Sequence, residues 1–203
     1  PEGCITGFIG INGAGKTTTL RTILGLTQKT SGNIQIFGLD MEKNAKQIKN
    51  RIGVVLDDGC FYDELSLAEM KSIIAPVYTT WSEQDFKYYM DMFALEPKQK
   101  ISTLSKGMKM KYALALALSH NAELLIMDEP TRGIDIGAKH EIYEIMESLA
   151  EQGKAIIMIS SEMAELIGMS DRIYVMSEGK LKGEITDRKD MTQEKIMGYA
   201  AQY

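Results

Sequence analysis

The chain has 203 residues, of which 44% are apolar, and a formal net charge of −5 at pH 7. This length fits one large domain, and the apolar share is sufficient for a sizeable core. The negative charge argues against a protein drawn to nucleic acid or anionic lipid by a general positive field. No apolar run approaches the roughly 18 residues of a membrane-spanning helix. The two cysteines, Cys4 and Cys60, form no disulfide framework, which favours a reducing, cytosolic setting.

The first predicted element is a short buried strand, Ile5–Ile9, which runs into Gly10-Ile11-Asn12-Gly13-Ala14-Gly15-Lys16-Thr17 and a predicted helix from Lys16 to Leu24. In this context the glycines let backbone N–H groups converge on a phosphate, and the helix N-terminus adds partial positive charge. Lys16 can reach the β- and γ-phosphates, and the Thr17 hydroxyl can ligate Mg²⁺. The loop therefore predicts binding of a nucleoside triphosphate. The expected contacts are Asn12, Gly13, Ala14, Gly15, Lys16, Thr17 and Thr18.

The remaining chain alternates between short apolar runs and helical patterns, which predicts an α/β fold with a parallel or mixed sheet flanked by helices. One stretch, from about residue 58 to residue 121, has a helical pattern throughout. Within it Ser82-Glu83-Gln84-Asp85 resembles a capping box, followed by apolar residues at helical spacing. We expect a helical subdomain, about 58–119, inserted into a core of about 1–57 and 120–203. The further predicted strands are Ile34–Phe37, Ile52–Leu56, Leu124–Met127, Ala155–Ile159 and Ile173–Met176.

Two carboxylates, Asp128 and Glu129, directly follow the predicted strand Leu124–Met127. Side chains at the carboxyl end of a strand face the crevice where α/β proteins bind ligands. Asp128 can hold Mg²⁺ there, and Glu129 can orient or deprotonate a water aimed at the γ-phosphate. Acidic residues are also common in turns after strands, but the phosphate loop upstream favours the catalytic interpretation.

A second candidate anion site lies at Leu104-Ser105-Lys106-Gly107-Met108, where a predicted helix begins and runs to about Ser119. Ser105 fits an ordinary N-cap. A serine and a glycine at a helix N-terminus also form an anion site of the same physical kind as the phosphate loop.

This ordered set of motifs resembles the ATP-binding cassette (ABC) ATPases, whose signature motif is Leu-Ser-x-Gly. Gly10–Thr17 matches Walker A, Leu124–Asp128 followed by Glu129 matches Walker B and the catalytic glutamate, and Gly133-Ile134-Asp135 resembles the D-loop. The resemblance implies a RecA-like P-loop core with a helical subdomain, binding of ATP with Mg²⁺, and two cassettes that meet head to tail. It also implies that Ser105, Lys106 and Gly107 contact the nucleotide held by the other cassette.

Two positions depart from the family pattern. The Q-loop position is Asp57, which can still ligate Mg²⁺ beside Thr17 and Asp128 but adds negative charge near the phosphates. The switch position, commonly histidine, is Glu162. An ionised glutamate cannot donate to the γ-phosphate and repels it unless protonated or bridged by water. The missing charge-assisted hydrogen bond is worth ~1.5–3 kcal/mol, so we expect a rate roughly 10- to 150-fold lower if that bond acts in the transition state.

The two parts of the chain resemble different groups of ABC ATPases. Residues 1 to about 128 resemble single-cassette transporter ATPases, whereas the part from about 128 onward resembles the second cassette of carbohydrate importers, in which glutamate at the switch position is familiar. The aromatic residue that stacks on adenine in the family lies upstream of Pro1, and Tyr62 and Tyr78 are in the wrong segment to replace it. We therefore expect either an N-terminal truncation or weak contact with the base.

These features predict an ATPase, with Lys16, Glu129 and Glu162 as its catalytic residues. We expect it to power a membrane transporter from the cytoplasmic face of the membrane, bound to a membrane-spanning permease through helices around 57–68 and 78–93 and paired with a second cassette. One alternative is a soluble ABC ATPase that acts on DNA or ribosomes, although the acidic balance argues against a nucleic-acid partner. Another alternative is a nucleotide-gated dimerisation module with little hydrolysis.

Overall fold

The computed structural model describes residues 1–57 and 60–201; Asp58, at the predicted start of the helical subdomain, lies outside them. Its main sheet has six strands in the order β4-β5-β6-β1-β7-β8, and every neighbouring pair is parallel except β7 with β8. The predicted α/β fold with a mixed, mostly parallel sheet is therefore confirmed. The strands are β1 (Ile5–Ile9), β4 (Ile52–Val55), β5 (Leu124–Asp128), β6 (Ala155–Ile159), β7 (Arg172–Ser177) and β8 (Lys180–Ile185).

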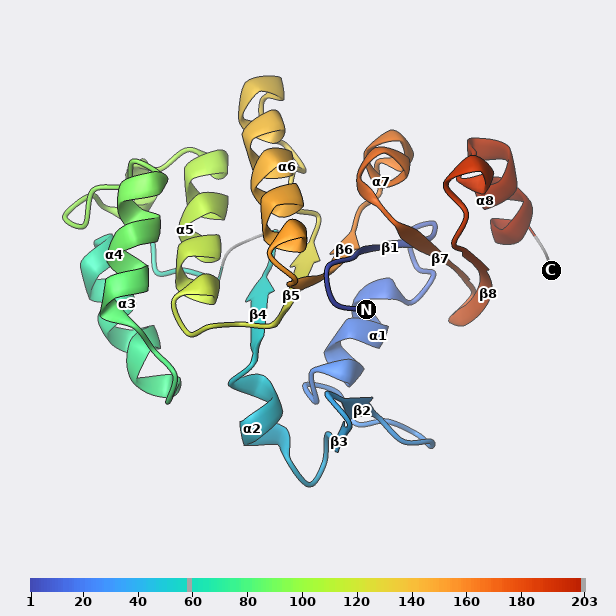
Figure 1. Cartoon of the computed structure of the whole chain (residues 1–203), viewed down its shortest axis with the longest axis horizontal. Helices are drawn as coiled ribbons and strands as arrows, with labels where there is room; N and C mark the ends of the chain where they lie inside the picture. Colours follow the sequence, from blue (N-terminus) through green and yellow to red (C-terminus); the bar gives the residue numbers. More distant parts are fainter. Residues whose placement is uncertain (58–59, 202–203) are drawn as a thin grey trace.

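Helices flank this sheet on both sides. Figure 1 shows α6 and α7 above the strands and α1 below them, while α3, α4 and α5 gather at the end of the sheet next to β4. The helices are α1 (Lys16–Ile23), α2 (Ala45–Lys49), α3 (Leu67–Ile74), α4 (Glu83–Met92), α5 (Lys106–Leu118), α6 (Ile136–Glu151), α7 (Met163–Met169) and α8 (Gln193–Ala200). Short 3₁₀ turns occur at Ala75–Val77, Ile101–Thr103 and Arg188–Asp190.

The all-helical stretch is confirmed for its described part, because residues 60–121 contain helices and turns but no strand of the sheet. Ser82 caps α4 by accepting from the Asp85 N–H at 3.1 Å, which is the serine half of the predicted capping box. A complete box begins α3 instead, where Ser66 and Glu69 satisfy each other's backbone N–H groups.

One apolar core joins these helices to the sheet. Tyr112 and Leu114 of α5 are fully buried in the same cluster as Leu125 of β5 and Ile156 of β6. The Tyr112 hydroxyl also donates to the carbonyl oxygen of Leu67 at 2.7 Å, which ties α5 to α3. Since apolar contacts run across the junction, the subdomain limits near 58 and 119 stay a prediction.

Two hairpins differ from the sequence prediction. The predicted strand Ile34–Phe37 is a two-residue strand, β2 (Gln35–Ile36), which pairs with β3 (Leu39–Asp40) in a separate small sheet. Strand β8 was not predicted, because its Lys-Leu-Lys-Gly-Glu-Ile sequence carries few apolar residues. Both hairpins turn through two residues with positive φ, Phe37-Gly38 and Glu178-Gly179, and this geometry suits the right-handed twist of paired strands.

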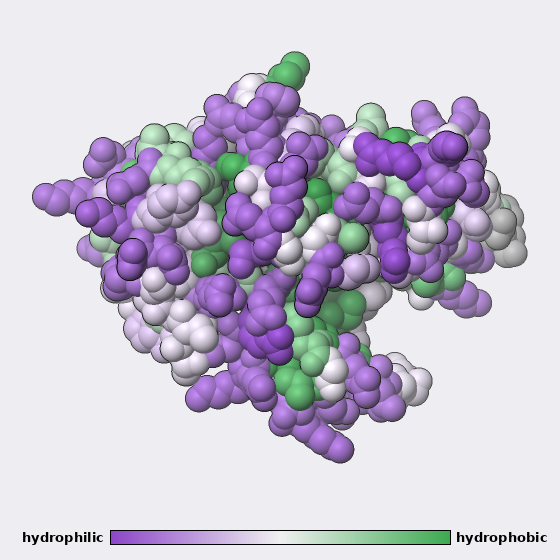
Figure 2. Space-filling view, viewed as in Figure 1, coloured by the Kyte–Doolittle hydropathy of each residue, from purple (hydrophilic) through white to green (hydrophobic). Residues whose placement is uncertain are grey.

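The face drawn in Figure 2 is mostly hydrophilic, with smaller apolar areas between the helices. In the part of the chain that the structure describes, no helix combines the length and apolar character needed to cross a membrane.

A buried histidine links the helical region to the strands. His120 is 1% exposed and stacks on the ring of Tyr78 with a centroid distance of 3.7 Å. Its Nδ1 lies 3.1 Å from the carbonyl oxygen of Asn50, which can only accept, so this nitrogen carries the proton. Burial lowers the pKa of His120 below its ordinary value of 6.5.

We expect this histidine to make folding pH-dependent. Below about pH 6.5 the unfolded chain binds a proton that the folded imidazole resists until the pH reaches its lower folded pKa. The free energy of unfolding should therefore decrease as the pH is lowered from about 7.5 to about 5, and it should decrease more steeply in wild type than in His120→Gln. Urea titration at each pH measures it. The exposed His140 supplies the control His140→Gln, which should keep the wild-type slope. Equal slopes for wild type and His120→Gln would contradict the expectation.

Candidate nucleotide-binding site

The carboxyl ends of β1, β4, β5 and β6 meet at one edge of the sheet, because these strands are parallel. Asp128 pairs with Ile159 there, and the Glu129 N–H donates to the Ile159 carbonyl at 2.8 Å. A cavity of about 440 Å³ opens at this edge. The phosphate loop and the two carboxylates, far apart in the sequence, thus share one cavity. Its lining residues are Asn12, Gly13, Ala14, Gly15, Lys16, Thr17, Thr18, Arg21, Asp57, Asp128, Glu129, Arg132 and Ile159.

Glycines are required in the loop for two different reasons. A Cβ at Gly10 would lie 2.4 Å from the backbone oxygen of Met176, so the close approach of loop and β7 needs glycine. Gly15, the N-cap of α1, has φ +97°, in the left-handed region that side chains disfavour. No side chain caps this helix in the described structure, and its first residues line the cavity, so their N–H groups can bind an anion there.

Lys16 is the cation that the loop itself holds. Its side chain is largely buried, and Nζ donates to the carbonyl oxygens of Gly10 at 2.6 Å and Ile11 at 3.3 Å. Thr17 and Thr18 follow it on the exposed side of the first helical turn. The ammonium group is therefore positioned beside the loop, where phosphate oxygens would meet it.

Carboxylates crowd the opposite side of the cavity. The pKa of Asp128 is raised, first by burial and then by the nearby charges of Glu129 and Asp57, against which Lys16 and Arg21 act. A divalent cation relieves such crowding, and Mg²⁺ prefers oxygen ligands. Among the described residues, however, no group of three His, Cys, Asp or Glu side chains is arranged to hold a metal. Mg²⁺ at this site would need the Thr17 hydroxyl and phosphate oxygens as well as Asp128.

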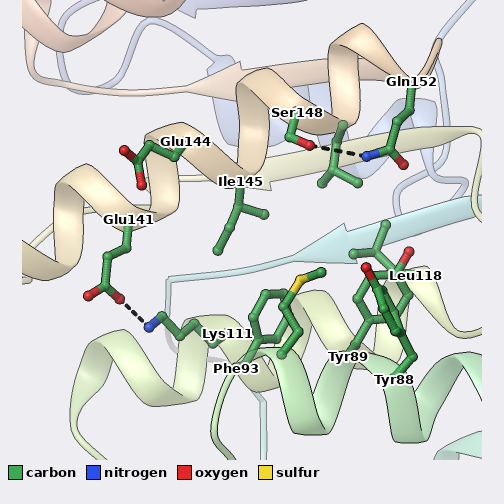
Figure 3. A pocket seen from close by; sticks show the side chains of 12 residues that line it. Tyr88, Tyr89, Phe93, Lys111, Leu118, Glu141, Glu144, Ile145, Ser148 and Gln152 are labelled. Carbon is green, nitrogen blue, oxygen red and sulfur yellow. Dashed lines mark hydrogen bonds and ion pairs between the residues drawn. The ribbon is translucent and has the colours of Figure 1, made fainter.

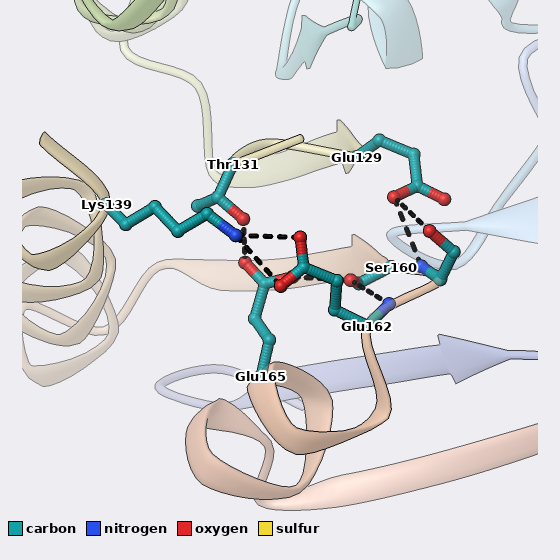
Figure 4. A network of polar contacts seen from close by, with 7 residues as sticks. Glu129, Thr131, Lys139, Ser160, Glu162 and Glu165 are labelled. Atoms are coloured by element: carbon teal, nitrogen blue, oxygen red, sulfur yellow. Dashed lines mark hydrogen bonds and ion pairs between the residues drawn. The ribbon is translucent and has the colours of Figure 1, made fainter. Parts of the chain in front are cut away.

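Glu129 is held in an unusual conformation at the edge of the cavity. Its φ is +51°, and a non-glycine residue in this region costs about 1–3 kcal/mol of backbone strain. Its Oε2 accepts from the Ser161 N–H at 3.1 Å and from the Ser161 hydroxyl at 3.0 Å. Figure 4 shows this carboxylate directed toward the loop that follows β6. That loop therefore sets where the Glu129 carboxylate points.

Asp57 lines the cavity but is also ion-paired within the chain. Its Oδ1 lies 2.5 Å from Lys106 Nζ, and its Oδ2 lies 3.5 Å from Arg132 Nη1. The extra negative charge expected at the Q-loop position is thus compensated by two cations. An Asp57 that ligates Mg²⁺ would have to share its oxygens with them.

The other residues of the candidate signature motif lie apart from this cavity. Ser105 caps α5 by accepting from the Met108 N–H at 3.2 Å, as predicted. Gly107 is buried against α6, where an added Cβ would lie 3.1 Å from the Ala138 Cβ. Of the residues that the structure describes, those lining the cavity include neither Ser105 nor Gly107.

Glu162 has a partner that the sequence analysis did not consider. Lys139 Nζ donates to both carboxylate oxygens of Glu162, at 2.7 and 2.8 Å. The pKa of Lys139 is raised, chiefly by this hydrogen bond. The sequence analysis expected Glu162 to repel the γ-phosphate unless it is protonated or bridged by water, and it did not consider that a cation could neutralise the carboxylate.

Four residues of the site were missed from the sequence: Arg21, Arg132, Ser161 and Lys139. Arg21 follows Thr17 by one helical turn on the same face, and that spacing is a signal that could have identified it. Arg132 lies in the turn just after Glu129, and Ser161 directly precedes Glu162. Lys139 gave no local signal, because its partner is on a different element.

A second hollow lies between α4, α5 and α6 (Figure 3), and the described residues that line it include none of the predicted site residues. Its floor is apolar, with Phe93 and Leu118, and an ion pair between Lys111 and Glu141 crosses one end.

Comparison with known proteins agrees with these features. A protein-family model described as "ABC transporter" matches residues 1–132. The Ribose import ATP-binding protein RbsA of Caldanaerobacter subterraneus subsp. tengcongensis is 38% identical, over 97% of this chain and 43% of that protein. The Galactose/methyl galactoside import ATP-binding protein MglA of Clostridium perfringens is 39% identical, over 100% of this chain and 42% of that protein. The chain thus spans less than half the length of these relatives, and its similarity to them includes residues before 128.

Solved structures share the fold. An ATP-binding subunit of an ABC transporter superposes with a TM-score of 0.83 and 27% identity, over 97% of this chain and 84% of that one. An ATP-binding cassette solved as a dimer with ADP and Pi has a TM-score of 0.79 at 22% identity, over 92% of this chain and 86% of that one, which compares the fold alone. From the family match, the relatives and the shared fold, the chain belongs to the ABC transporter family, as an ATP-binding domain.

Proposed function

We propose that this domain hydrolyses ATP to power an importer of ribose- or galactose-type sugars. The observation that carries the proposal is the shared cavity of Lys16, Thr17, Asp128 and Glu129, at the edge where the parallel strands end. The printed names of the relatives, which are import ATP-binding proteins for these sugars, supply the substrate class.

Within that cavity each group has a role in phosphoryl transfer. Lys16 and the N–H groups of residues 12–18 bind the phosphates, and Thr17 and Asp128 hold Mg²⁺, with Asp57 as a further candidate ligand. A Mg²⁺ ion held by these residues would supply positive charge against the phosphates. Glu129, oriented by Ser161, takes a proton from the attacking water or orients it.

The site is completed by a second cassette. Ser105, Lys106 and Gly107 would contact the triphosphate that the other cassette holds, since they lie at the N-terminus of a 13-residue helix, outside the cavity of their own chain. Two helix N-termini then converge on one polyanion, so that ATP holds the cassettes together and hydrolysis releases them. Lys106 would exchange its bond to Asp57 for the phosphate during closure.

A membrane-spanning permease would receive this motion. We place its docking surface on the segments 57–68 and 78–93. The helix expected at 57–68 is wrong for most of its described part, because α3 begins only at Leu67, whereas 78–93 contains α4. The pair of cassettes would lie at the cytoplasmic face of the membrane. The net charge of −5 supports a protein partner over nucleic acid.

The two departures at Asp57 and Glu162 would lower the rate of hydrolysis. Glu162 cannot donate to the γ-phosphate, and the missing bond corresponds to roughly a 10- to 150-fold slower step. Under this proposal Glu162→His hydrolyses ATP faster than wild type in the same assay. An unchanged rate would remove Glu162 as the cause.

ATP turnover against protein concentration tests the proposed function. With Mg²⁺ and saturating ATP, a site shared by two chains gives a total rate of phosphate release that rises with the square of the protein concentration when the protein is dilute. Linear dependence down to the lowest concentrations would contradict a shared site. A protein that forms ATP-bound dimers without releasing phosphate would instead be a dimerisation module.

Reconstitution of the full-length protein with its permease, and uptake of labelled ribose or galactose, then tests the substrate class.

A further inference from the structure

Lys139 lies where α6 and the loop after β6 meet. Its side chain is 19% exposed, whereas the carboxylate that it binds, that of Glu162, is 50% exposed. Both Glu162 oxygens accept from the one ammonium group. This two-pronged contact restrains Glu162 more tightly than a single surface ion pair would.

The contact continues into the loop that holds Glu129. The Glu162 N–H donates to the Ser160 hydroxyl oxygen at 2.9 Å, and the Ser160 hydroxyl donates to Glu165. Ser161, between them, holds the Glu129 carboxylate through its N–H and its hydroxyl. Figure 4 shows the contacts of Lys139, Glu162 and Glu165 as one set and those to Glu129 as another, and the backbone of the loop after β6 connects the two sets. A change at Lys139 can therefore reach Glu129 through three neighbouring residues of one loop.

A second carboxylate strengthens the need for this cation. Glu165 is 8% exposed and accepts hydrogen bonds from the hydroxyls of Thr131 and Ser160. Its charge adds to that of Glu162 at the Lys139 ammonium. Lys139 thus faces a buried and a half-exposed carboxylate, and the second of these belongs to the loop that holds Glu129.

We propose that Lys139 is a positioning residue for ATP hydrolysis, which neutralises Glu162 and thereby keeps the 160–162 loop and Glu129 in place beside the γ-phosphate. This inference rests on the proposed ATPase function. Without Lys139, the Glu162 carboxylate repels the incoming phosphates, and the loop that orients Glu129 loses its restraint. Both the KM for ATP and kcat respond, because the first effect acts on binding and the second on the chemical step.

Four variants of the full-length protein test the inference by steady-state phosphate release with Mg²⁺: Lys139→Met, Lys139→Arg, Glu162→Gln and the double variant Lys139→Met/Glu162→Gln. We expect Lys139→Met to lower kcat/KM by about 10-fold or more, and Lys139→Arg to stay within about 3-fold of wild type because arginine keeps the positive charge. The double variant should match Glu162→Gln within about 3-fold, because the carboxylate that Lys139 binds directly is then already neutral. The exposed Lys46 of α2 gives the matched control Lys46→Met, which should leave kcat/KM unchanged.

The outcomes separate this inference from the function on which it rests. A Lys139→Met protein with wild-type kcat/KM overturns the inference, as does a loss that Glu162→Gln fails to suppress. Thermal unfolding of each variant shows whether a loss of rate comes from unfolding. The double variant separates this case from the proposed one, because Glu162→Gln restores the rate only if the loss came from the unneutralised Glu162 carboxylate. If wild type itself hydrolyses no ATP, the proposed function fails, and Lys139 is then assessed by ATP affinity, which Lys139→Met should lower and the double variant restore.

Discussion

Glu129→Gln is expected to abolish ATP turnover while ATP binding is retained. Glutamine keeps the size of the side chain and can still accept from the Ser161 N–H and hydroxyl, but it cannot take a proton from water. Loss of a general base lowers kcat by about 10²- to 10⁴-fold. Phosphate release measures the rate, and sedimentation with ATP and Mg²⁺ measures the dimer, which should accumulate because the phosphate that bridges two cassettes is no longer removed.

The exposed Glu147 of α6 provides the matched control, since Glu147→Gln removes the same charge away from the cavity and should leave turnover unchanged. Turnover by Glu129→Gln at the wild-type rate would contradict the assignment of Glu129 as the base. A wild-type protein that already accumulates ATP-bound dimer without turnover would favour the dimerisation module.

Lys16→Ala is expected to abolish ATP binding. The ammonium group supplies the charge that meets the β- and γ-phosphates, and two charge-assisted hydrogen bonds at ~1.5–3 kcal/mol each correspond to a loss in affinity of roughly 10²- to 10⁴-fold. Titration calorimetry with ATP and Mg²⁺ measures the Kd. The exposed Lys43 gives the control Lys43→Ala, which should bind as wild type does.

Lys16 also donates to the carbonyl oxygens of Gly10 and Ile11, so its removal can loosen the loop itself. Thermal unfolding without nucleotide separates this effect, because a folded Lys16→Ala that fails to bind has lost the phosphate contact. Binding of ATP by Lys16→Ala with wild-type affinity would contradict the assignment of the loop.

Much of the fold was predictable because its signals are local. The apolar runs that became β1, β5 and β6 are buried in the sheet, and the α5 N-cap at Ser105 formed as its sequence predicts. Strand β8 was missed because it forms only by pairing with β7 at the edge of the sheet, where a polar sequence is tolerated. Strand β2 was predicted, within Ile34–Phe37, but its pairing with β3 in a separate small sheet was not.

The sequence by itself determined the phosphate loop and the two carboxylates after β5, because each of these groups is contiguous and carries its chemistry in adjacent residues. Only the tertiary structure decided how the departures from the family pattern are accommodated. Lys106 and Arg132 compensate Asp57, and Lys139 compensates Glu162, across pairs of residues that lie on separate elements. Such ion pairs depend on which strands and helices meet at the edge of the sheet, and no local pattern in the chain encodes that meeting.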